Sequence, residues 1–193
     1  MGKLILGLVV FFGGHSVSLL ALGWRDRMAQ RLGVRTWQGA YSILALLGFY
    51  LLVSGNGAAG PVAAVLYAPP PWLHYVAAVL MLPVFTLALS SVLRGRIQAR
   101  AGHPLVLATM LWSAAHLLTN GSAAGVLLFG TFLAWALIVH RSLARRPARR
   151  MIALPASMAN DVIVVVGGLA LYAAFILVLH ARWIGVPALG VSL

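Results

Sequence analysis

Long apolar stretches with almost no charged residues recur along this chain, and they constrain its fold more than any other feature. Each is close to the length of about 20 residues that a helix needs to cross the hydrocarbon core of a bilayer. Charged residues make up only 8% of the chain, against about a quarter in a soluble domain. The sequence therefore predicts an all-α integral membrane protein, a six-helix bundle that forms one domain over residues 1–193. The expected spans are about 4–22, 36–53, 72–93, 104–120, 123–139 and 162–179.

Arginine-rich connections alternate with uncharged ones between these stretches. The connections after the first, third and fifth spans hold twelve of the fourteen Lys and Arg residues, and those after the second and fourth hold none. Because positively charged loops stay on the cytoplasmic side of a membrane, the alternation predicts a multi-pass protein with both termini on the periplasmic side. The net charge of +12 is accordingly interpreted as orientation and contact with anionic lipid, and nucleic acid is not expected as a partner.

The composition also excludes several kinds of site. The chain has no Cys and no Glu, and its two acidic residues are Asp26 and Asp161. Disulfides, thiolate ligands, a cysteine nucleophile and a carboxylate-bound di-metal centre are therefore excluded, and a paired-carboxylate acid–base site is not expected. The ionisable groups left for chemistry are six histidines, five tyrosines and the arginines.

Individual residues predict local features of the spans. Gly7 and other small residues share one face of the first span, where another helix or a flat cofactor can approach the backbone. Pro83 lies in the middle of the third span and is expected to kink it. Asn160 and Asp161 precede the sixth span and are expected to cap it. Residues 24–37 are expected to form a basic, amphipathic loop.

The fourth span has the most distinctive pattern. It opens with His103-Pro104, and proline suits the first position of a helix because its missing N–H would have no partner there. It closes at Asn120-Gly121, a typical C-terminal stop. A polar stripe centred on a histidine needs a functional explanation in a helix that otherwise suits lipid. The polar residues on this one face are Thr109, Ser113, His116 and Asn120.

The six histidines divide by predicted depth. At a rise of 1.5 Å per residue, His15 lies ~12 Å and His116 ~18 Å from the cytoplasmic ends of their spans, well inside a core about 30 Å thick. Ionisable groups there are costly and usually functional, with an interhelical hydrogen bond as the plain alternative. The other four are expected at the membrane surfaces: His74, His103, His140 and His180.

Two mid-membrane histidines on different helices can hold the two axial positions of a haem, whose apolar ring suits such surroundings. His103 and His116 cannot share one metal ion, because the helix between them separates them by ~20 Å. Without cysteines or nearby carboxylates, a zinc site is poorly supported. We therefore expect His15 and His116 to ligate a haem iron, with a polar residue on the same face orienting the His116 imidazole.

Four segments resemble the NnrU family of bacterial membrane proteins over roughly residues 3–145. They are FFGGHSVSLLALGWRDR, WQGAYSILALLGFYLL, RGRIQARAGHP and LWSAAHLLTNGSAAGVLLFGTFLAW. NnrU proteins are similar in turn to the 15-cis-zeta-carotene isomerase of plants and cyanobacteria. That enzyme is an integral membrane haem b protein with two histidine ligands, and its ligation changes with the redox state of the iron.

The resemblance implies haem b as the cofactor and names the same pair of ligands. The isomerase has a histidine-serine in an early span, which is similar to His15-Ser16. Its later Ala-His is similar to Ala115-His116. Both positions are therefore implied to be axial ligands.

The resemblance also implies a wider site and a location. The His-Pro of the isomerase is similar to His103-Pro104, which implies a role for His103 beside substrate or cofactor, but Gly102 stands where the isomerase has arginine. The implied activity is a redox-linked, isomerase-like reaction on a lipophilic small molecule, or a role in nitric oxide metabolism and denitrification. The implied setting is the bacterial inner membrane, with a membrane redox partner.

A second resemblance competes. Membrane methyltransferases of the isoprenylcysteine type also have a His-Pro that opens a helix before a tight hairpin, where they bind S-adenosylmethionine. This chain lacks their preceding arginine, their aromatic residue (Val106 and Leu107 stand there) and their downstream acidic residues. A non-enzymatic membrane assembly factor is a third alternative, so whether the protein is an enzyme stays open.

Overall fold

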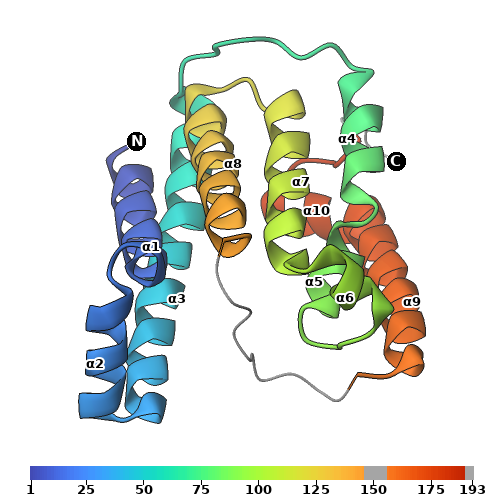
Figure 1. Cartoon of the computed structure of the whole chain (residues 1–193). Coiled ribbons are helices and arrows are strands. Elements are labelled where there is room, and N and C mark those ends of the chain that lie inside the picture. The colour runs from blue at the N-terminus through green and yellow to red at the C-terminus, as the bar shows by residue number, and fades with distance from the viewer. Residues whose placement is uncertain (146–155, 190–193) are drawn as a thin grey trace. The chain divides into compact units, whose positions relative to one another are not determined.

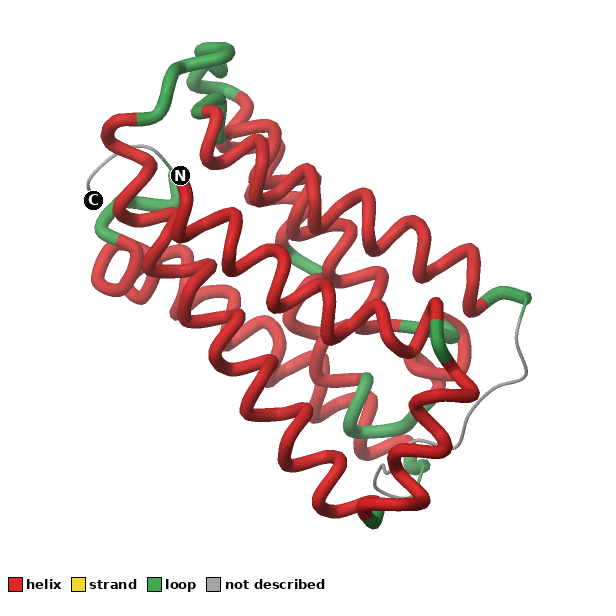
Figure 2. The backbone as a smooth tube through the Cα atoms, turned by 90° about the vertical axis from the view of Figure 1, so that its left-hand side faces the viewer, coloured by secondary structure: helices red, strands yellow, loops and turns green. Residues whose placement is uncertain are grey.

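The computed structural model describes residues 1–145 and 156–189, and most of them are helical. Figure 2 shows helices joined by loops, with no strand drawn in this part of the chain. An isolated antiparallel bridge joins Val65 and Ser122. The all-α class expected from the sequence is confirmed.

Within the described residues, five helical stretches are long and apolar enough to cross a bilayer. A shorter apolar helix, α7 at Pro104–Thr119, stands at the fourth expected span. Large apolar side chains such as Val9, Ile43 and Val79 are exposed on these helices, as suits a surface that contacts lipid. The protein is therefore membrane-embedded. The five long stretches are Gly2–Leu20, Val34–Ala59, Leu73–Ser90, Ala123–Leu143 and Met158–Ile184.

The chain forms two compact units (Figure 1). The first consists of Met1–Leu66 and Ser122–Thr131, and the second of Tyr67–Gly121 and Phe132–Leu193. Helix α8 at Ala123–Leu143 contributes its first part to one unit and its second part to the other.

In the first unit, helices α1 (Gly2–Leu20) and α3 (Val34–Ala59) pack side by side (Figure 1). They run antiparallel, and glycines let their backbones touch, because a side chain at these points would collide with the facing helix. The close approach expected at Gly7 is thus confirmed, with a helix as the partner. A Cβ atom would lie 2.7 Å from Leu52 N at Gly7, 2.8 Å from Phe11 N at Gly48 and 2.6 Å from Leu4 N at Gly55.

Two features of the first unit differ from expectation. The basic segment expected as a loop contains helix α2 at Leu22–Leu32, which packs beside α3 with the Trp24 and Trp37 rings 5.7 Å apart. Gly33 ends α2 with a φ of 83°, a left-handed value that glycine adopts without strain. Helix α3 also continues past the expected end near residue 53, where Gly55 packs against the backbone of α1, and it leads into the short helix η1 at Gly60–Val62.

The second unit is built around short helices that pack on α7. Helix α4 (Leu73–Met81) and helix α5 (Val84–Ser90) are separated by a break at Pro83, as the sequence predicts. Both pack against α7, and α5 also packs against α9 (Met158–Ala174). The rest of the unit is α6 (Arg96–Ala101), the π-helical turn η2 (Phe175–Leu179) and α10 (His180–Ile184).

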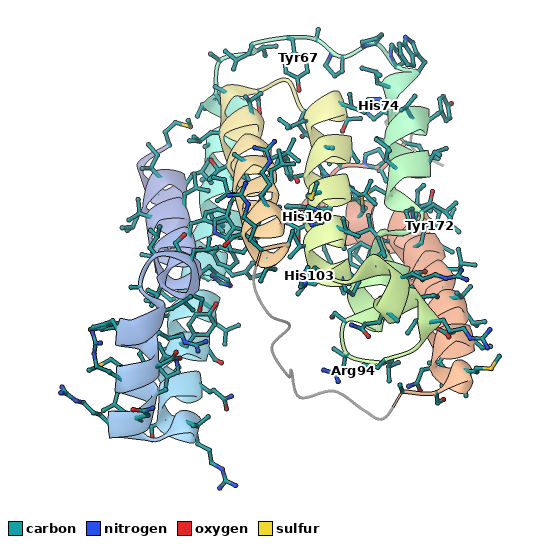
Figure 3. The ribbon with its side chains drawn as sticks, viewed as in Figure 1. Tyr67, His74, Arg94, His103, His140 and Tyr172 are labelled. Atoms are coloured by element: carbon teal, nitrogen blue, oxygen red, sulfur yellow. The ribbon has the colours of Figure 1, made fainter. Side chains whose placement is uncertain are left out.

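Close contacts join α9 to α4 and α5. A Cβ atom at Gly168 would lie 2.6 Å from Thr86 N, so only glycine fits there. The Tyr172 hydroxyl, labelled in Figure 3, donates a hydrogen bond of 3.0 Å to the Ala78 carbonyl oxygen. Together these contacts hold the second half of α9 against α5 and α4.

The sequence predicted the wrong capping residues for α9. The Ser157 side chain caps the helix by accepting a hydrogen bond from Asn160 N at 3.3 Å. The Asp161 carboxylate instead accepts from the backbone N–H groups of Arg96 and Ile97, at 2.9 and 3.0 Å. An acidic side chain is stabilised by the unpaired N–H groups at a helix start, and here that start belongs to α6.

Candidate functional site

His15 lies in α1, on the side that packs against α3. Its Nδ1–H donates a hydrogen bond of 2.7 Å to the carbonyl oxygen of Phe11, one turn earlier. Its ring stacks on Phe11 with centroids 4.1 Å apart, and the centroid of the Tyr41 ring from α3 lies 5.3 Å away, with the two planes inclined by 61°. Aromatic side chains from both helices therefore fix the orientation of this half-buried imidazole.

His116 lies near the end of α7 and repeats the same pattern. Its Nδ1–H donates a hydrogen bond of 2.8 Å to the carbonyl oxygen of Trp112, again one turn earlier. The centroid of the Trp112 ring lies 5.1 Å from that of the imidazole, and Phe132 of α8 makes a T-shaped contact with Trp112 at 5.2 Å. His15 belongs to the first unit and His116 to the second.

The two hydrogen bonds define which nitrogen of each histidine can bind a metal. A carbonyl oxygen only accepts, so Nδ1 carries the proton in the neutral ring and Nε2 carries the lone pair. Metal-ligating histidines are typically oriented by a hydrogen bond of this kind from the other ring nitrogen. The donor chemistry of His15 and of His116 therefore fits axial ligation of a haem iron.

The other polar residues on the His116 face bond to the backbone of their own helix. Thr109 Oγ1 donates to Leu105 O at 2.9 Å, and Ser113 Oγ, which is fully buried, donates to Thr109 O at 2.5 Å. Asn120 Nδ2 donates to the backbone oxygen of His116 at 3.0 Å. Hydroxyl groups in membrane helices commonly bond in this way. The carbonyl of Trp112 is the partner of the imidazole itself.

A tyrosine outside the helices holds the end of α7. The Tyr67 hydroxyl donates to the carbonyl oxygens of Leu117 and Asn120, the latter at 3.0 Å. The Tyr67 backbone N–H donates to Gly121 O at 3.3 Å, and a Cβ atom at Gly121 would collide with Tyr67 O. The carbonyl groups at the end of a helix have no partner within it, so this clamp stabilises the turn that follows His116.

His103 lies at the opposite end of α7. It is the residue before the first helical turn, and Pro104 takes the first position of the helix as the sequence predicts. Figure 3 shows His103 and Arg94 at one end of the second unit and His74 and Tyr67 at the other. The arrangement agrees with the expected separation of His103 from the end of α7 that carries His116.

His180 has a neighbour that the sequence did not predict. Its ring centroid lies 6.3 Å from that of His116, with the planes inclined by 32°. Its Nδ1–H donates a hydrogen bond of 2.7 Å to the Val186 carbonyl oxygen, so this imidazole too is anchored through Nδ1. The sequence had suggested only a histidine at a membrane surface.

The feature that the sequence analysis missed is the backbone conformation of the turn before His180. The backbone N–H of His180 donates to Phe175 O, five residues earlier, which is the hydrogen bond of a π-helix. His180 follows Gly168 by twelve residues, which in a regular helix places it ~120° around the axis from Gly168. A π turn absorbs one extra residue and reduces that offset to ~20°. The ring is thereby brought to the side on which α9 packs.

Other histidines and acidic residues do not extend the site into a larger metal centre. His74 Nδ1 pairs with Pro71 O at 3.2 Å. The Nδ1 atom of His140 is buried and has no hydrogen-bond partner in the described part of the chain. Over residues 1–145 and 156–189, no group of three or more His, Asp or Glu side chains gathers around a common point.

Comparison with known proteins gives one clear result. The model of the family described as NnrU protein matches residues 3–188, nearly the whole chain. No match was found among curated proteins or among solved structures. The match includes both apolar helices that carry an imidazole anchored to the preceding turn. The chain belongs to the NnrU family.

Proposed function

We propose that this NnrU protein binds haem b within the membrane, with His15 and His116 as axial ligands. The observation that carries the proposal is the common anchoring of the two imidazoles, each through Nδ1 to a carbonyl oxygen four residues earlier. Both rings lie among aromatic side chains in apolar helices, surroundings that suit a porphyrin. Haem b supplies one-electron chemistry when it is bound.

The residues around these histidines have separate roles in the proposal. The Phe11 and Trp112 carbonyls hold the two imidazoles in the tautomer that ligates through Nε2. Thr109, Ser113 and Asn120 maintain the backbone of α7 on the face that carries His116. His103, at the other end of α7, would contact substrate or a propionate group.

The proposed activity is a redox-linked, isomerase-like reaction on a lipophilic small molecule, or a redox role in nitrogen-oxide metabolism. Apolar helices on which large side chains are exposed suit the access of such a substrate from lipid. The proposed location is the bacterial inner membrane, with both termini periplasmic and a membrane redox partner. The alternation of arginine-rich and uncharged connections supports that orientation.

An absorption spectrum of the purified, haem-replete protein tests the proposal. We expect a six-coordinate low-spin ferric spectrum, because two imidazoles fill both axial positions. His15→Ala and His116→Ala should each abolish that state and leave five-coordinate iron or protein without haem. His74→Ala is the matched control, since His74 is also bonded through Nδ1 to a carbonyl oxygen and should leave the spectrum unchanged. A protein expressed with ample haem that shows no Soret band would contradict haem binding.

A further inference from the structure

We propose that His116 and His180 together bind a copper ion, in competition with the haem for which His116 is a proposed ligand. The expected competition with haem rests on the proposed function. The pairing of His116 with His180 rests only on contacts within the second unit. The two imidazole centroids lie 6.3 Å apart.

The separation of the rings matches two imidazoles on opposite sides of one ion. A metal–nitrogen bond of about 2.0 Å and a ring radius of about 1.1 Å place such centroids ~6 Å apart. Cu(II) favours square-planar coordination by nitrogen and oxygen, in which two ligands stand opposite each other. Two histidines and two water oxygens complete that arrangement. A tetrahedral ion such as zinc would require the rings to approach each other by about 1 Å.

Both rings are held in the protonation state that the proposed site needs. Nδ1 of His116 donates to Trp112 O at 2.8 Å, and Nδ1 of His180 donates to Val186 O at 2.7 Å. In each neutral ring the lone pair is then on Nε2, the nitrogen that would ligate the ion. The bond to Val186 depends on Gly185, whose φ of 85° turns the chain back at the end of α10.

The backbone turn before His180 determines the side of the helix on which this imidazole lies. The wide turn at η2 changes the register of the last helix at the residue where His180 begins α10. Such π turns cost regular hydrogen bonding and occur frequently at functional sites. The aromatic rings of Phe85 and Trp183 flank Phe175 in this turn, at 5.0 and 5.7 Å, and hold it in place.

The chemistry of the surroundings selects the class of ion. The two acidic side chains of the chain are engaged elsewhere, Asp26 with Arg25 in the first unit and Asp161 with the start of α6. The chain has no cysteine, so the pair offers neutral imidazole nitrogen alone. Imidazole suits copper, zinc, nickel and iron, and copper binds most strongly among the divalent ions of this series.

Copper binding is tested on the full-length protein purified without haem and with any affinity tag removed. Cu(II) is added, and its affinity is measured by calorimetry while electron paramagnetic resonance counts the coordinated nitrogens. We expect one Cu(II) per chain with two imidazole nitrogens. His116→Ala and His180→Ala should each remove this site, whereas His15→Ala and His74→Ala should leave it intact. Gly185→Ala, which keeps both ligands but strains the turn that carries Val186, should weaken binding by about tenfold or more.

The variants separate this inference from haem binding. His15→Ala should lose low-spin haem and keep copper, His180→Ala should do the reverse, and His116→Ala should lose both. Addition of haem to the copper-loaded protein should release the ion. Copper binding that is unaffected by His180→Ala, or lost equally in His74→Ala, would overturn the site. A missing Soret band with copper binding intact would overturn only the haem proposal.

Discussion

The carboxylate of Asp161 accepts a hydrogen bond of 2.9 Å from the backbone N–H of Arg96. A second oxygen of the same carboxylate accepts from Ile97 N, and Asn160 Nδ2 donates to Arg94 O at 2.7 Å. The start of α9 therefore holds the basic segment of α6 through backbone groups, and the arginine side chains take no part in these bonds.

The Gly95→Ala substitution should release this segment. A Cβ atom at Gly95 would collide with the Asp161 carboxylate, so the bonds to Arg96 and Ile97 cannot form in their present geometry. Limited trypsin digestion should then cut after Arg96 and Arg100 several-fold faster than in the unchanged protein. Gly130→Ala is the control, because a Cβ atom there meets nothing within 4 Å. Equal cleavage rates in all three proteins would show that the contact does not order α6.

Larger side chains at the α1–α3 contact should destabilise the first unit. Gly48→Ala and Gly55→Ala place a methyl group less than 3 Å from the facing backbone, and overpacking of this kind typically costs about 1–3 kcal/mol. The free energy of unfolding of the purified protein, measured with a denaturing detergent, should fall by that amount. Gly57→Ala lies in the same helix with open space around it and should have little effect. A similar shift for all three variants would show that helix propensity, and not packing against α1, causes the change in stability.

The Tyr67→Phe substitution should loosen the end of α7. It removes the donor to Leu117 O and Asn120 O, and a net contribution of about 0.5–1.5 kcal/mol is typical of such a bond. Burial raises the pKa of the Tyr67 phenol above its ordinary value, so the hydroxyl remains a donor at neutral pH. The contribution of this hydroxyl to the free energy of unfolding is fully present below the pKa of the phenol in the unfolded chain, about 10. It is lost as the pH rises through the higher pKa of the phenol in the folded protein. A stability difference that vanishes already near neutrality would contradict this assignment.

Reporter fusions test the proposed orientation. A reporter active in the cytoplasm should be active after Arg31, Arg96 or Arg146, because these arginine-rich connections are expected on that side. A reporter active in the periplasm should be active after Gly57, Asn120 or Leu193. Of these positions, Arg146 and Leu193 lie outside the described residues. A cytoplasmic Asn120 would reverse the depths assigned to His15 and His116.

Calorimetry with S-adenosylmethionine tests the methyltransferase alternative. The groups that a charged cofactor needs are missing from the sequence around His103-Pro104, so no binding is expected at high micromolar concentration. Saturable binding that His103→Ala weakens would favour the methyltransferase instead. In the haem-replete protein, His103→Ala is expected to retain the cofactor, because His103 lies at the far end of α7 from His116.

Features that depend on local chemistry could be predicted from the sequence. The all-α class follows from the apolar stretches, the break at Pro83 from the missing N–H of proline, and the start of α7 at Pro104 from its fixed φ. Asn120 likewise follows the last residue of α7. Each of these depends on one residue and its immediate neighbours.

Features that depend on distant contacts could not be predicted in the same way. In the extension of α3, Gly55 meets the backbone of α1, and the periodicity of the α3 sequence does not show that contact. Asp161 stands where a local cap is plausible, but its partners lie 65 and 64 residues away. The roles of His15 and His116 as ligands stay a prediction, supported by how each ring is anchored.

The wide turn at η2 makes the pairing of two histidines depend on the shape of one helical turn as well as on residue identity. This turn accommodates one extra residue, so His180 lies ~20° around the axis from Gly168 although it follows Gly168 by twelve residues. If the same residues formed a regular α-helix, His180 and all that follows would be rotated by ~100°. A change that converts this turn to α-helical hydrogen bonding would therefore separate the two rings without altering either histidine.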